Sequence, residues 1–373
     1  MSGLYVHVPF CAQKCSYCDF HFSTSFESYR KEMIYAIANE ICERKEELST
    51  PLSSVYFGGG TPSILNKQEL ALILDSVFKS FSLDDDLELT LEANPENISF
   101  ENTSDWKKLG FNRLSIGLQS FKKEDLVWMN RNHSSEDNLS CLQTVQNVGF
   151  KNISVDLMYG LPDLSSKEWL SFLDKVTSLG VQHLSAYCLT VEDKTKLKRD
   201  IAKGKIKPIP EQQQVEQFEL LVSFLKSRKY EQYEVSSFAK DRCYSKHNTS
   251  YWKGASYIGV GPSAHSFDGE KRRWNIANNK TYLRKSNEKD WYKEEVLSLD
   301  SKWNELFLTG LRTKWGVSKK HIGALGGFAF SEQQELLSFQ KKGLVIEKEH
   351  CFVLTDKGML FADGISQAFF RVS

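Results

Sequence analysis

Short apolar segments alternate with amphipathic helical patterns through the first half of this 373-residue chain. Each segment is rich in β-branched and aromatic residues, as strands usually are. The predicted strands lie at residues 4–10, 54–60, 87–94, 113–120, 152–160 and 183–190. Strands that alternate with helices pair in parallel, because each helix returns the chain to the same end of the sheet. The pattern predicts an α/β fold, either a doubly wound open sheet or a curved, partly closed barrel.

The segments between the strands space their apolar residues as helices do. The predicted helices lie at residues 26–48, 67–81, 134–149, 166–180 and 210–230. Ser134 and Asp137 have the spacing of an N-terminal capping box. Gly149 and Gly180 stand where helices commonly end. These signals support regular strand–helix units rather than an irregular fold.

Polar residues gather late in several of these strands. Glu92 lies near the end of the third strand, Gln119 ends the fourth and Asp156 lies in the fifth. The carboxyl ends of parallel strands meet at one edge, where active sites are usually built. The cysteine-rich stretch "HVPFCAQKCSYCDFHF" follows the first strand, and "GGGTPS" follows the second. We therefore predict a single site formed by these loops.

Composition limits what the cysteines do. The chain carries 48 basic and 48 acidic residues, so no net charge attracts nucleic acid. We found no apolar run of roughly 18 residues that could span a membrane, and the first residues lack a signal-peptide pattern. We therefore expect a cytoplasmic protein without a transmembrane segment. In that reducing compartment the eight cysteines are not expected to form a disulfide scaffold.

Cys11, Cys15 and Cys18 can converge on one metal centre, but three thiolates leave one coordination position unfilled. A structural zinc completed by His7 or His21 is one alternative, although no second pair of ligands follows in the chain. A redox dithiol needs only two cysteines and leaves the third unexplained. The remaining option is a 4Fe-4S cluster with three irons held by cysteine and one iron open to a ligand.

The spacing Cys-x3-Cys-x2-Cys, with Tyr17 just before the last cysteine, resembles the signature of the radical S-adenosylmethionine (SAM) superfamily. In that superfamily the open iron binds the amino and carboxylate groups of SAM, and the cluster donates an electron that cleaves the sulfonium. The motifs "YVHVPFC", "GGGTP", "EANPE", "GLQSF", "NRNH" and "DLMYGLP" resemble the coproporphyrinogen oxidase branch over essentially the whole chain. This resemblance implies a partial (β/α)6 TIM-like barrel with a small C-terminal winged-helix-like domain.

The resemblance also implies a set of SAM-binding residues, matched motif by motif. They are Tyr5, Tyr17, Gly60, Thr61, Glu92, Gln119, Arg131, Asp156 and Cys188. Carboxylates suit the sulfonium, the amine and the ribose hydroxyls, while Arg131 and Gln119 suit the carboxylate and adenine edges. The alternative for Glu92 and Asp156 is a buried salt bridge. The alternative for the glycine loop is a structural turn, since the Gly-Lys-Ser/Thr ending of a phosphate-binding loop is absent.

Three features favour the HemW-type heme chaperones of this branch over the oxidases. The oxidases carry a further cysteine where this chain has Phe20, and they begin with an extension upstream of the cysteine motif. The stretch "KHNTSYW" matches a His-Asn-x-x-Tyr-Trp motif typical of HemW, in which the histidine, here His247, is implicated in heme binding. Cys243 and His265 are rival ligands. A structural role for His247 as a hydrogen-bond node is the remaining alternative.

The sequence therefore predicts three segments and one preferred function. Residues 1–235 would form the barrel, 236–295 a family-specific segment, and 296–373 the winged-helix-like domain. The preferred function is a heme chaperone that carries a 4Fe-4S cluster and SAM and transfers heme to an acceptor protein. The alternatives are an oxygen-independent coproporphyrinogen III oxidase and a binding module in which the cluster only regulates shape. Expected partners are heme, a heme-accepting protein and, if the cluster is reduced, an electron donor. A homodimer is an alternative to a monomer.

Overall fold

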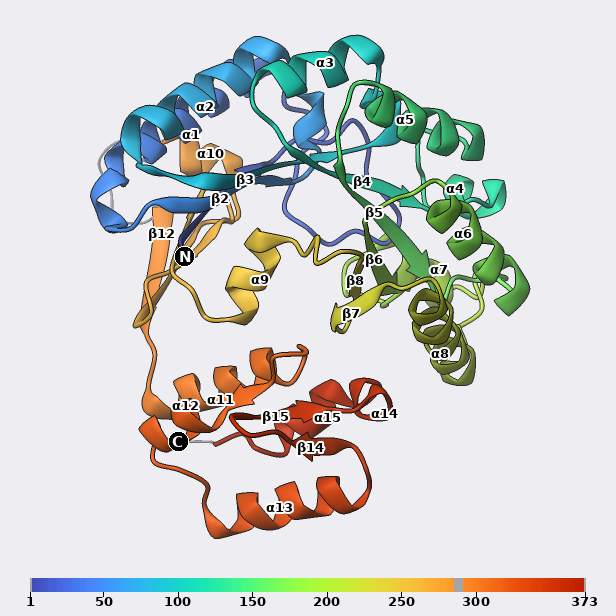
Figure 1. Cartoon of the computed structure of the whole chain (residues 1–373). Coiled ribbons are helices and arrows are strands. Elements are labelled where there is room, and N and C mark those ends of the chain that lie inside the picture. Colours follow the sequence, from blue (N-terminus) through green and yellow to red (C-terminus); the bar gives the residue numbers. More distant parts are fainter. Residues whose placement is uncertain (1, 285–290, 372–373) are drawn as a thin grey trace.

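The computed structural model describes residues 2–284 and 291–371. Its main feature is a curved 12-stranded sheet in the order β12-β11-β10-β9-β1-β2-β3-β4-β5-β6-β8-β7 (Figure 1). The six predicted strands are parallel neighbours at its centre. They are β1 (Ser2–Val8), β2 (Leu52–Gly59), β3 (Leu83–Ala93), β4 (Arg113–Gln119), β5 (Asn152–Tyr159) and β6 (His183–Cys188). The structure confirms the predicted α/β partial barrel, whose sheet has β12 and β7 as its two edges.

Helices cover the outer face of the parallel strands (Figure 1). They are α1 (Arg30–Glu43), α2 (Lys67–Ser80), α3 (Phe100–Lys108), α4 (Lys123–Trp128), α5 (Ser135–Asn147), α6 (Ser166–Ser178), α7 (Lys196–Ala202) and α8 (Glu211–Ser227). The predicted capping box is confirmed, because Ser134 Oγ accepts from Asp137 N and the Asp137 carboxylate accepts from Ser134 N. The sequence did not predict α3, α4 and α7, which are short.

The chain after α8 lengthens the sheet at both ends. The hairpin β7 (Glu231–Glu234) and β8 (Ser237–Ala239) joins β6, while β9 (Tyr257–Val260) pairs in parallel with β1. Strands β10 (His265–Phe267), β11 (Lys271–Asn275) and β12 (Tyr292–Val296) continue outward from β9. Helices α9 (Lys246–Trp252) and α10 (Asn279–Leu283) complete this part. Residues 285–290, within the predicted segment 236–295, lie outside the described residues.

The last part of the chain forms a smaller unit below the barrel (Figure 1). Its elements are α11 (Leu299–Gly310), β13 (Val317–Ser318), α12 (Lys319–Ala324), α13 (Phe330–Lys341), β14 (Val345–Glu347), β15 (Cys351–Leu354), α14 (Asp356–Met359) and α15 (Ala362–Gln367). Trp303, Phe307 and Phe369 are buried in its core. The antiparallel hairpin of β14 and β15 confirms the predicted two-strand wing. We call this part the C-terminal unit.

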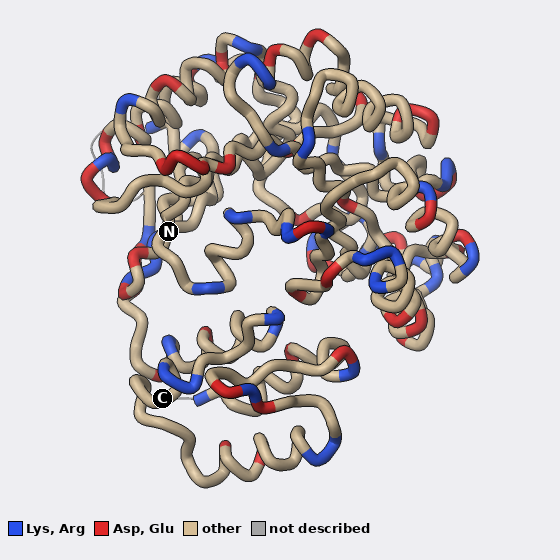
Figure 2. The backbone as a smooth tube through the Cα atoms, viewed as in Figure 1, with Lys and Arg blue, Asp and Glu red and all other residues tan. Residues whose placement is uncertain are grey.

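Charges of both signs are spread over the outer helices of the barrel and over the C-terminal unit (Figure 2). This distribution fits the balanced composition of the chain. In residues 2–284 and 291–371, no helix is both long and apolar enough to cross a membrane.

A buried ion pair at the end of α1 joins the barrel to strands β9–β12 and helix α10, which we call the extension. Glu40 and Arg44 lie 3.2 Å apart, and Glu40 is 0% exposed. Arg44 donates to the carbonyl of Gly259 at 2.7 Å, while Glu40 accepts from Gly261 N at 2.9 Å. The side chain of Asn275 also donates to Glu40, at 2.8 Å. Because these partners lie on or near β9 and β11, the pair fixes the position of the added strands against α1.

We expect Glu40→Ala to lower the free energy of unfolding by about 1–3 kcal/mol, since it leaves the buried Gly261 N–H and Asn275 amide without this acceptor. Arg44 keeps a second carboxylate partner, Glu47, at 2.7 Å. Urea denaturation followed by circular dichroism measures this loss. Glu43→Ala on the same helix is the matched control, because Glu43 is exposed, and its effect should stay within about 0.5 kcal/mol. Equal effects of the two substitutions would contradict the assigned role of Glu40.

Candidate functional site

Side chains of the parallel strands alternate between two environments. In β4, Leu114, Ile116 and Leu118 are 0% exposed and belong to the apolar core. Ser115, which lies between them, and Gln119, which follows Leu118, face the opposite side, because strand side chains have a period of two. The concave side of the curved sheet is therefore lined by polar side chains. We call this polar interior the lumen.

The cysteine loop follows β1 and packs directly on the glycine loop that follows β2. Thr61 N donates to the carbonyl of Phe10 at 2.7 Å, and Thr61 Oγ1 donates to Cys11 Sγ at 3.4 Å. A Cβ atom on Gly60 would lie 2.4 Å from the carbonyl oxygen of Phe10, so a larger residue would separate the two loops. The backbone of the glycine loop therefore approaches the cysteine loop closely.

Arg131 connects the second cysteine to the ends of β3 and β4. Its Nη1 donates to Cys15 Sγ at 3.7 Å, and its Nη2 donates to Asn94 Oδ1 at 2.9 Å and to the carbonyl of Gly117 at 2.7 Å. A Cβ atom on Gly117 would meet Gln119 Nε2 at 2.9 Å, so this glycine makes room for Gln119 beside Arg131. Arg131 and Gln119 thus converge as the sequence predicted, and Asn94 joins them as a residue outside the predicted set.

Tyr17 lies close to the same arginine and cysteine. Burial raises its pKa above the ordinary value, the positive charge of Arg131 lowers it, and nearby Cys15 and Cys18 raise it. The Tyr17 hydroxyl therefore stays protonated at neutral pH and can donate a hydrogen bond.

Two carboxylates lie in the lumen beyond these loops. Glu92 accepts from the Tyr56 hydroxyl at 2.8 Å, and burial together with the nearby charge of Asp156 raises the pKa of Glu92 to about 7. Burial also raises the pKa of Asp156 to about 6, although its hydrogen bond with Ser185 and the charge of Arg113 oppose the shift. Among the described residues neither carboxylate is part of an ion pair, so a structural salt bridge does not occupy them.

The three cysteines of the motif are partly buried on one loop. Burial raises the pKa of Cys11 to about 12 and that of Cys18 to about 11, and the neighbouring cysteines contribute to both shifts. In the described residues no three His, Cys, Asp or Glu side chains are arranged to hold a metal ion. The three thiols of this one loop are nevertheless the type of donor that an iron–sulfur cluster takes, since a bound metal stabilises the thiolate form.

The zinc alternative needs a histidine beside these thiols. His7 Nε2 is hydrogen-bonded to the carbonyl of His21 at 2.9 Å, and its Nδ1 lies 3.3 Å from the Tyr5 hydroxyl. His21 Nε2 is hydrogen-bonded to Asn279 Oδ1 at 2.8 Å. These histidines are held by other partners, which disfavours either as a fourth zinc ligand.

Tyr5 and Cys188 occupy opposite sides of the predicted site. Tyr5 stacks on Tyr56 with ring centroids 6.2 Å apart, next to Glu92. Cys188 ends β6, where a Cβ atom on Gly160 would lie 3.2 Å from its sulfur. Burial raises the pKa of Cys188 to about 11, so its thiol is protonated at neutral pH. No hydrogen bond between Cys188 and the cysteine loop is found within the described part of the chain.

His247 lies on α9 and faces the lumen from the other end. It is 1% exposed, its Nδ1 is hydrogen-bonded to Ser54 Oγ at 2.9 Å, and its Nε2 to the Tyr251 hydroxyl at 2.6 Å. Its ring stacks on Tyr56 at 5.0 Å. Burial lowers the pKa of His247 to about 3, which keeps the imidazole neutral. Both ring nitrogens therefore have partners, and heme ligation would have to displace one of them.

The rival heme ligands Cys243 and His265 are less buried than His247. Cys243 is partly buried in the segment before α9, and burial raises its pKa. His265 on β10 is exposed and stacks on Trp274 with ring centroids 6.2 Å apart. Neither residue shares the Ser54 and Tyr251 contacts of His247.

Comparisons with known proteins agree along the chain. Residues 5–176 match the Radical SAM superfamily, and residues 297–361 match the HemN C-terminal domain. A protein of Bacillus subtilis called "Heme chaperone HemW" is 34% identical, with 99% of each chain covered. A protein of the same name from Haemophilus influenzae is 30% identical over 98% of this chain and 97% of its own.

Comparison with solved structures also supports this fold. The solved structure of coproporphyrinogen III oxidase (HemN) from Escherichia coli, described as a radical SAM enzyme, superposes with a TM-score of 0.84 at 24% sequence identity. The superposition covers 99% of this chain and 89% of that chain. At this identity the likeness concerns the fold, while the full-length HemW relatives define the branch. With its three-cysteine loop, glycine loop and partial barrel, the chain belongs to the HemN-like proteins of the radical SAM superfamily, in the HemW family.

Proposed function

We propose that this protein is a HemW-type heme chaperone that binds a 4Fe-4S cluster, SAM and heme, and passes heme to an acceptor protein. The main structural support for this proposal is the packing of the glycine loop on the cysteine loop, where Thr61 donates to both Phe10 and Cys11. This contact brings a ligand loop and a loop of free backbone groups to one edge of the sheet. Its full-length relatives from Bacillus subtilis and Haemophilus influenzae are named heme chaperones.

Cys11, Cys15 and Cys18 would hold the cluster. When bound, such a cluster supplies one open iron for the amino acid end of SAM and a source of single electrons. Thr61 and Arg131 already hydrogen-bond two of the sulfurs, at 3.4 and 3.7 Å. Hydrogen bonds to sulfur and limited exposure tune such a centre. An electron donor is therefore a proposed partner.

The SAM-binding residues would be those predicted from the motifs, with Asn94 and Tyr56 added by the structure. Glu92 and Asp156 would attract the cationic groups of the ligand, because neither has an ion-pair partner in the described residues. Arg131 and Gln119 would orient its carboxylate or adenine edge. Asn94 fixes Arg131, and Tyr56 fixes Glu92. The proposed set is completed by Tyr5, Tyr17, Gly60, Thr61 and Cys188.

Phe20 supports a chaperone over an oxidase. Its side chain is 69% exposed beside the cluster loop, where the resembled oxidases have a cysteine. A phenyl ring cannot act as a thiol, a ligand or a hydrogen-bond partner. We further propose that the protein acts in the cytoplasm, since all eight of its cysteines are free.

We propose His247 as the heme ligand in a state where Tyr251 has moved away. The neutral imidazole that its lowered pKa implies is the form that binds heme iron. The hydrogen bond between the Tyr251 hydroxyl and Nε2 occupies this nitrogen, so the contact opposes ligation. Heme binding then depends on the competition between iron and Tyr251 for the same nitrogen.

SAM binding should strengthen as pH rises through about 7, the raised pKa of Glu92. Protonated Glu92 is neutral, and the cationic ligand favours its ionised form, so binding should level off above that pH. The same raised pKa means that ionised Glu92 destabilises the ligand-free protein, so its stability should fall between the ordinary carboxyl pKa and pH 7. Isothermal titration at several pH values measures the binding.

Glu92→Gln should weaken SAM binding and remove the dependence near pH 7, leaving the part near pH 6 that Asp156 causes. Glu101→Gln, an exposed position on α3, is the matched control and should retain the wild-type pH profile. An unchanged profile in the Glu92 variant would exclude that carboxyl from the site.

Tyr251→Phe should strengthen heme binding by about fivefold, because it removes a hydrogen bond worth about 1 kcal/mol that competes for His247 Nε2. His247→Ala should weaken binding and shift the Soret band in a heme titration. His265→Ala serves as the control and should bind heme as the wild type does. If Tyr251→Phe and His247→Ala both leave the Soret band and the affinity unchanged, His247 is a structural hydrogen-bond node.

Protein reconstituted anaerobically with iron and sulfide should not convert coproporphyrinogen III to protoporphyrinogen in the presence of SAM and a reductant. The reason is the absence of the additional thiol at Phe20. Product analysis by chromatography tests this, with an authentic oxidase as positive control. Formation of protoporphyrinogen would favour the oxidase, and a colourless protein with zinc and no iron would contradict the cluster.

A further inference from the structure

A groove of about 820 Å³ separates the barrel from the C-terminal unit. We call it the junction groove. One wall is formed by the end of α8 and by β7, and the other by the β14–β15 hairpin and α14. The two walls come from segments more than a hundred positions apart in the chain. The groove lies away from the cysteine loop, and none of the predicted cluster, SAM or heme residues lines it.

The floor of the junction groove is apolar. Phe238, Val353, Leu354 and Met359 are buried beneath it, while Ile346 is 44% exposed. An exposed isoleucine over a buried apolar floor favours a ligand that brings apolar groups of its own, because covering Ile346 removes apolar surface from water.

The rim of the groove is basic. The lining residues contain five lysines and only two carboxylates, those of Glu231 and Asp356. Both carboxylates are already paired, Asp356 with Lys226 at 2.9 Å and Glu231 with Lys314 at 2.8 Å. The other three lysines are exposed and have no ion-pair partner among the described residues: Lys229, Lys348 and Lys357. The groove therefore carries positive charge that its own residues do not neutralise.

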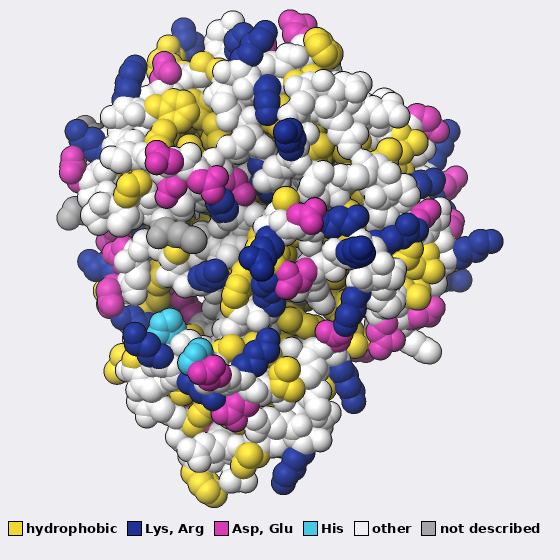
Figure 3. Space-filling view, viewed as in Figure 1, with side chains coloured by type: hydrophobic (Ala, Val, Ile, Leu, Met, Phe, Trp, Pro, Cys, Tyr) yellow, Lys and Arg dark blue, Asp and Glu magenta, His cyan; other side chains and the backbone are white. Residues whose placement is uncertain are grey.

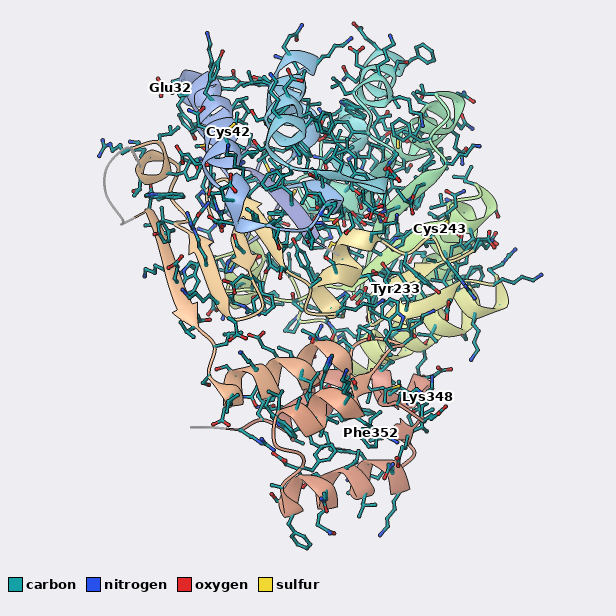
Figure 4. All side chains as sticks on the ribbon, turned by 60° about the vertical axis from the view of Figure 1, so that its left-hand side comes forward. Glu32, Cys42, Tyr233, Cys243, Lys348 and Phe352 are labelled. Atoms are coloured by element: carbon teal, nitrogen blue, oxygen red, sulfur yellow. The ribbon has the colours of Figure 1, made fainter. Side chains whose placement is uncertain are left out.

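The three unpaired lysines come from both walls. Lys229 follows α8, whereas Lys348 and Lys357 belong to the C-terminal unit. Figure 4 shows Lys348 at the upper margin of the C-terminal unit, with Tyr233 in the barrel above it. Along this boundary Figure 3 shows basic and apolar side chains close together on one face. A ligand in the groove would thus contact positive charges on two sides.

The barrel wall also offers part of a sheet edge. Strand β7 is the last strand of the large sheet, and it pairs with β8 on one side. On its other side, Val235 N donates to the carbonyl of Arg312 and Lys314 N donates to the carbonyl of Tyr233. These contacts leave Glu231 and Gln232, which line the groove, at the uncovered end of the edge. Extended peptides commonly bind to exposed strand edges of this kind.

We propose that the junction groove binds an extended segment of a partner protein in which acidic residues alternate with apolar ones. The acidic residues would face Lys229, Lys348 and Lys357, and the apolar residues would cover Ile346. Heme itself, an amphipathic dicarboxylate, fits less well, since no histidine or cysteine is among the described residues that line the groove. The identification of this partner as the heme acceptor rests on the function proposed above. The docking of an acidic segment does not depend on that function.

The test uses the full chain and a fluorescein-labelled peptide of alternating Glu and Leu residues, followed by fluorescence anisotropy at low salt. The variant Lys229→Glu/Lys348→Glu/Lys357→Glu should bind the peptide at least about tenfold more weakly than the wild type, since it reverses the rim charge. The control variant Lys79→Glu/Lys108→Glu/Lys151→Glu reverses three exposed lysines on the outer face of the barrel and should bind normally. Circular dichroism melts establish that both variants fold.

A peptide of alternating Lys and Leu residues should not bind the wild type, and Ile346→Ala should weaken binding of the acidic peptide. Equal loss in both triple variants, or failure of the wild type to bind the acidic peptide, overturns the proposal. If hemin displaces the peptide from the groove, the groove is a heme site and the proposal is also overturned. The groove variant should bind heme as the wild type does. If neither the wild type nor the variants bind heme, the proposed heme function is refuted, but the docking of an acidic segment is not.

Discussion

The period of two along parallel strands governs this structure. Each central strand buries one set of side chains against the helices, so the other set must face the shared lumen. Polar residues placed there need partners, and Glu88 illustrates how they find them. Its carboxylate accepts from the backbone N–H groups of Lys246 and His247 at 3.0 and 3.1 Å, which docks α9 onto the sheet. The lumen is therefore closed at one end by a helix that a strand carboxylate holds.

The positive charge of Arg113 in the lumen is shared among several carboxylates and does not form one close ion pair. Arg113 is 1% exposed, and its closest carboxylate oxygen, on Glu88, is 4.0 Å away. The charge of Arg113 lowers the pKa values of Glu92 and Asp156, while burial raises both more strongly. The two carboxylates thus titrate near neutral pH. A site of this kind responds strongly to a ligand with positive charge, because water does not screen it well.

Local sequence signals were enough to predict the central strands and five helices, because alternation and capping act over a few residues. The sequence also located Thr61 and Arg131 near the cysteines through motif resemblance. It did not reveal that β9 extends the sheet beside β1, or that His247 bonds Ser54, 193 positions away. These contacts depend on how distant segments meet. Asn94 was visible in "EANPE", but only its contact with Arg131 gives it a role.

The contact between His21 and Asn279 links the cysteine loop to α10, and Tyr282 of α10 donates to Glu40 at 2.5 Å. The loop and the extension thus share one chain of hydrogen bonds that leads to the core of α1. Segments connected in this way tend to open as one cooperative unit. Filling the cysteine loop with iron and sulfide would therefore slow amide hydrogen exchange in β10 and β11, more than two hundred residues further along the chain. Cluster binding and the local unfolding of the extension are therefore thermodynamically coupled.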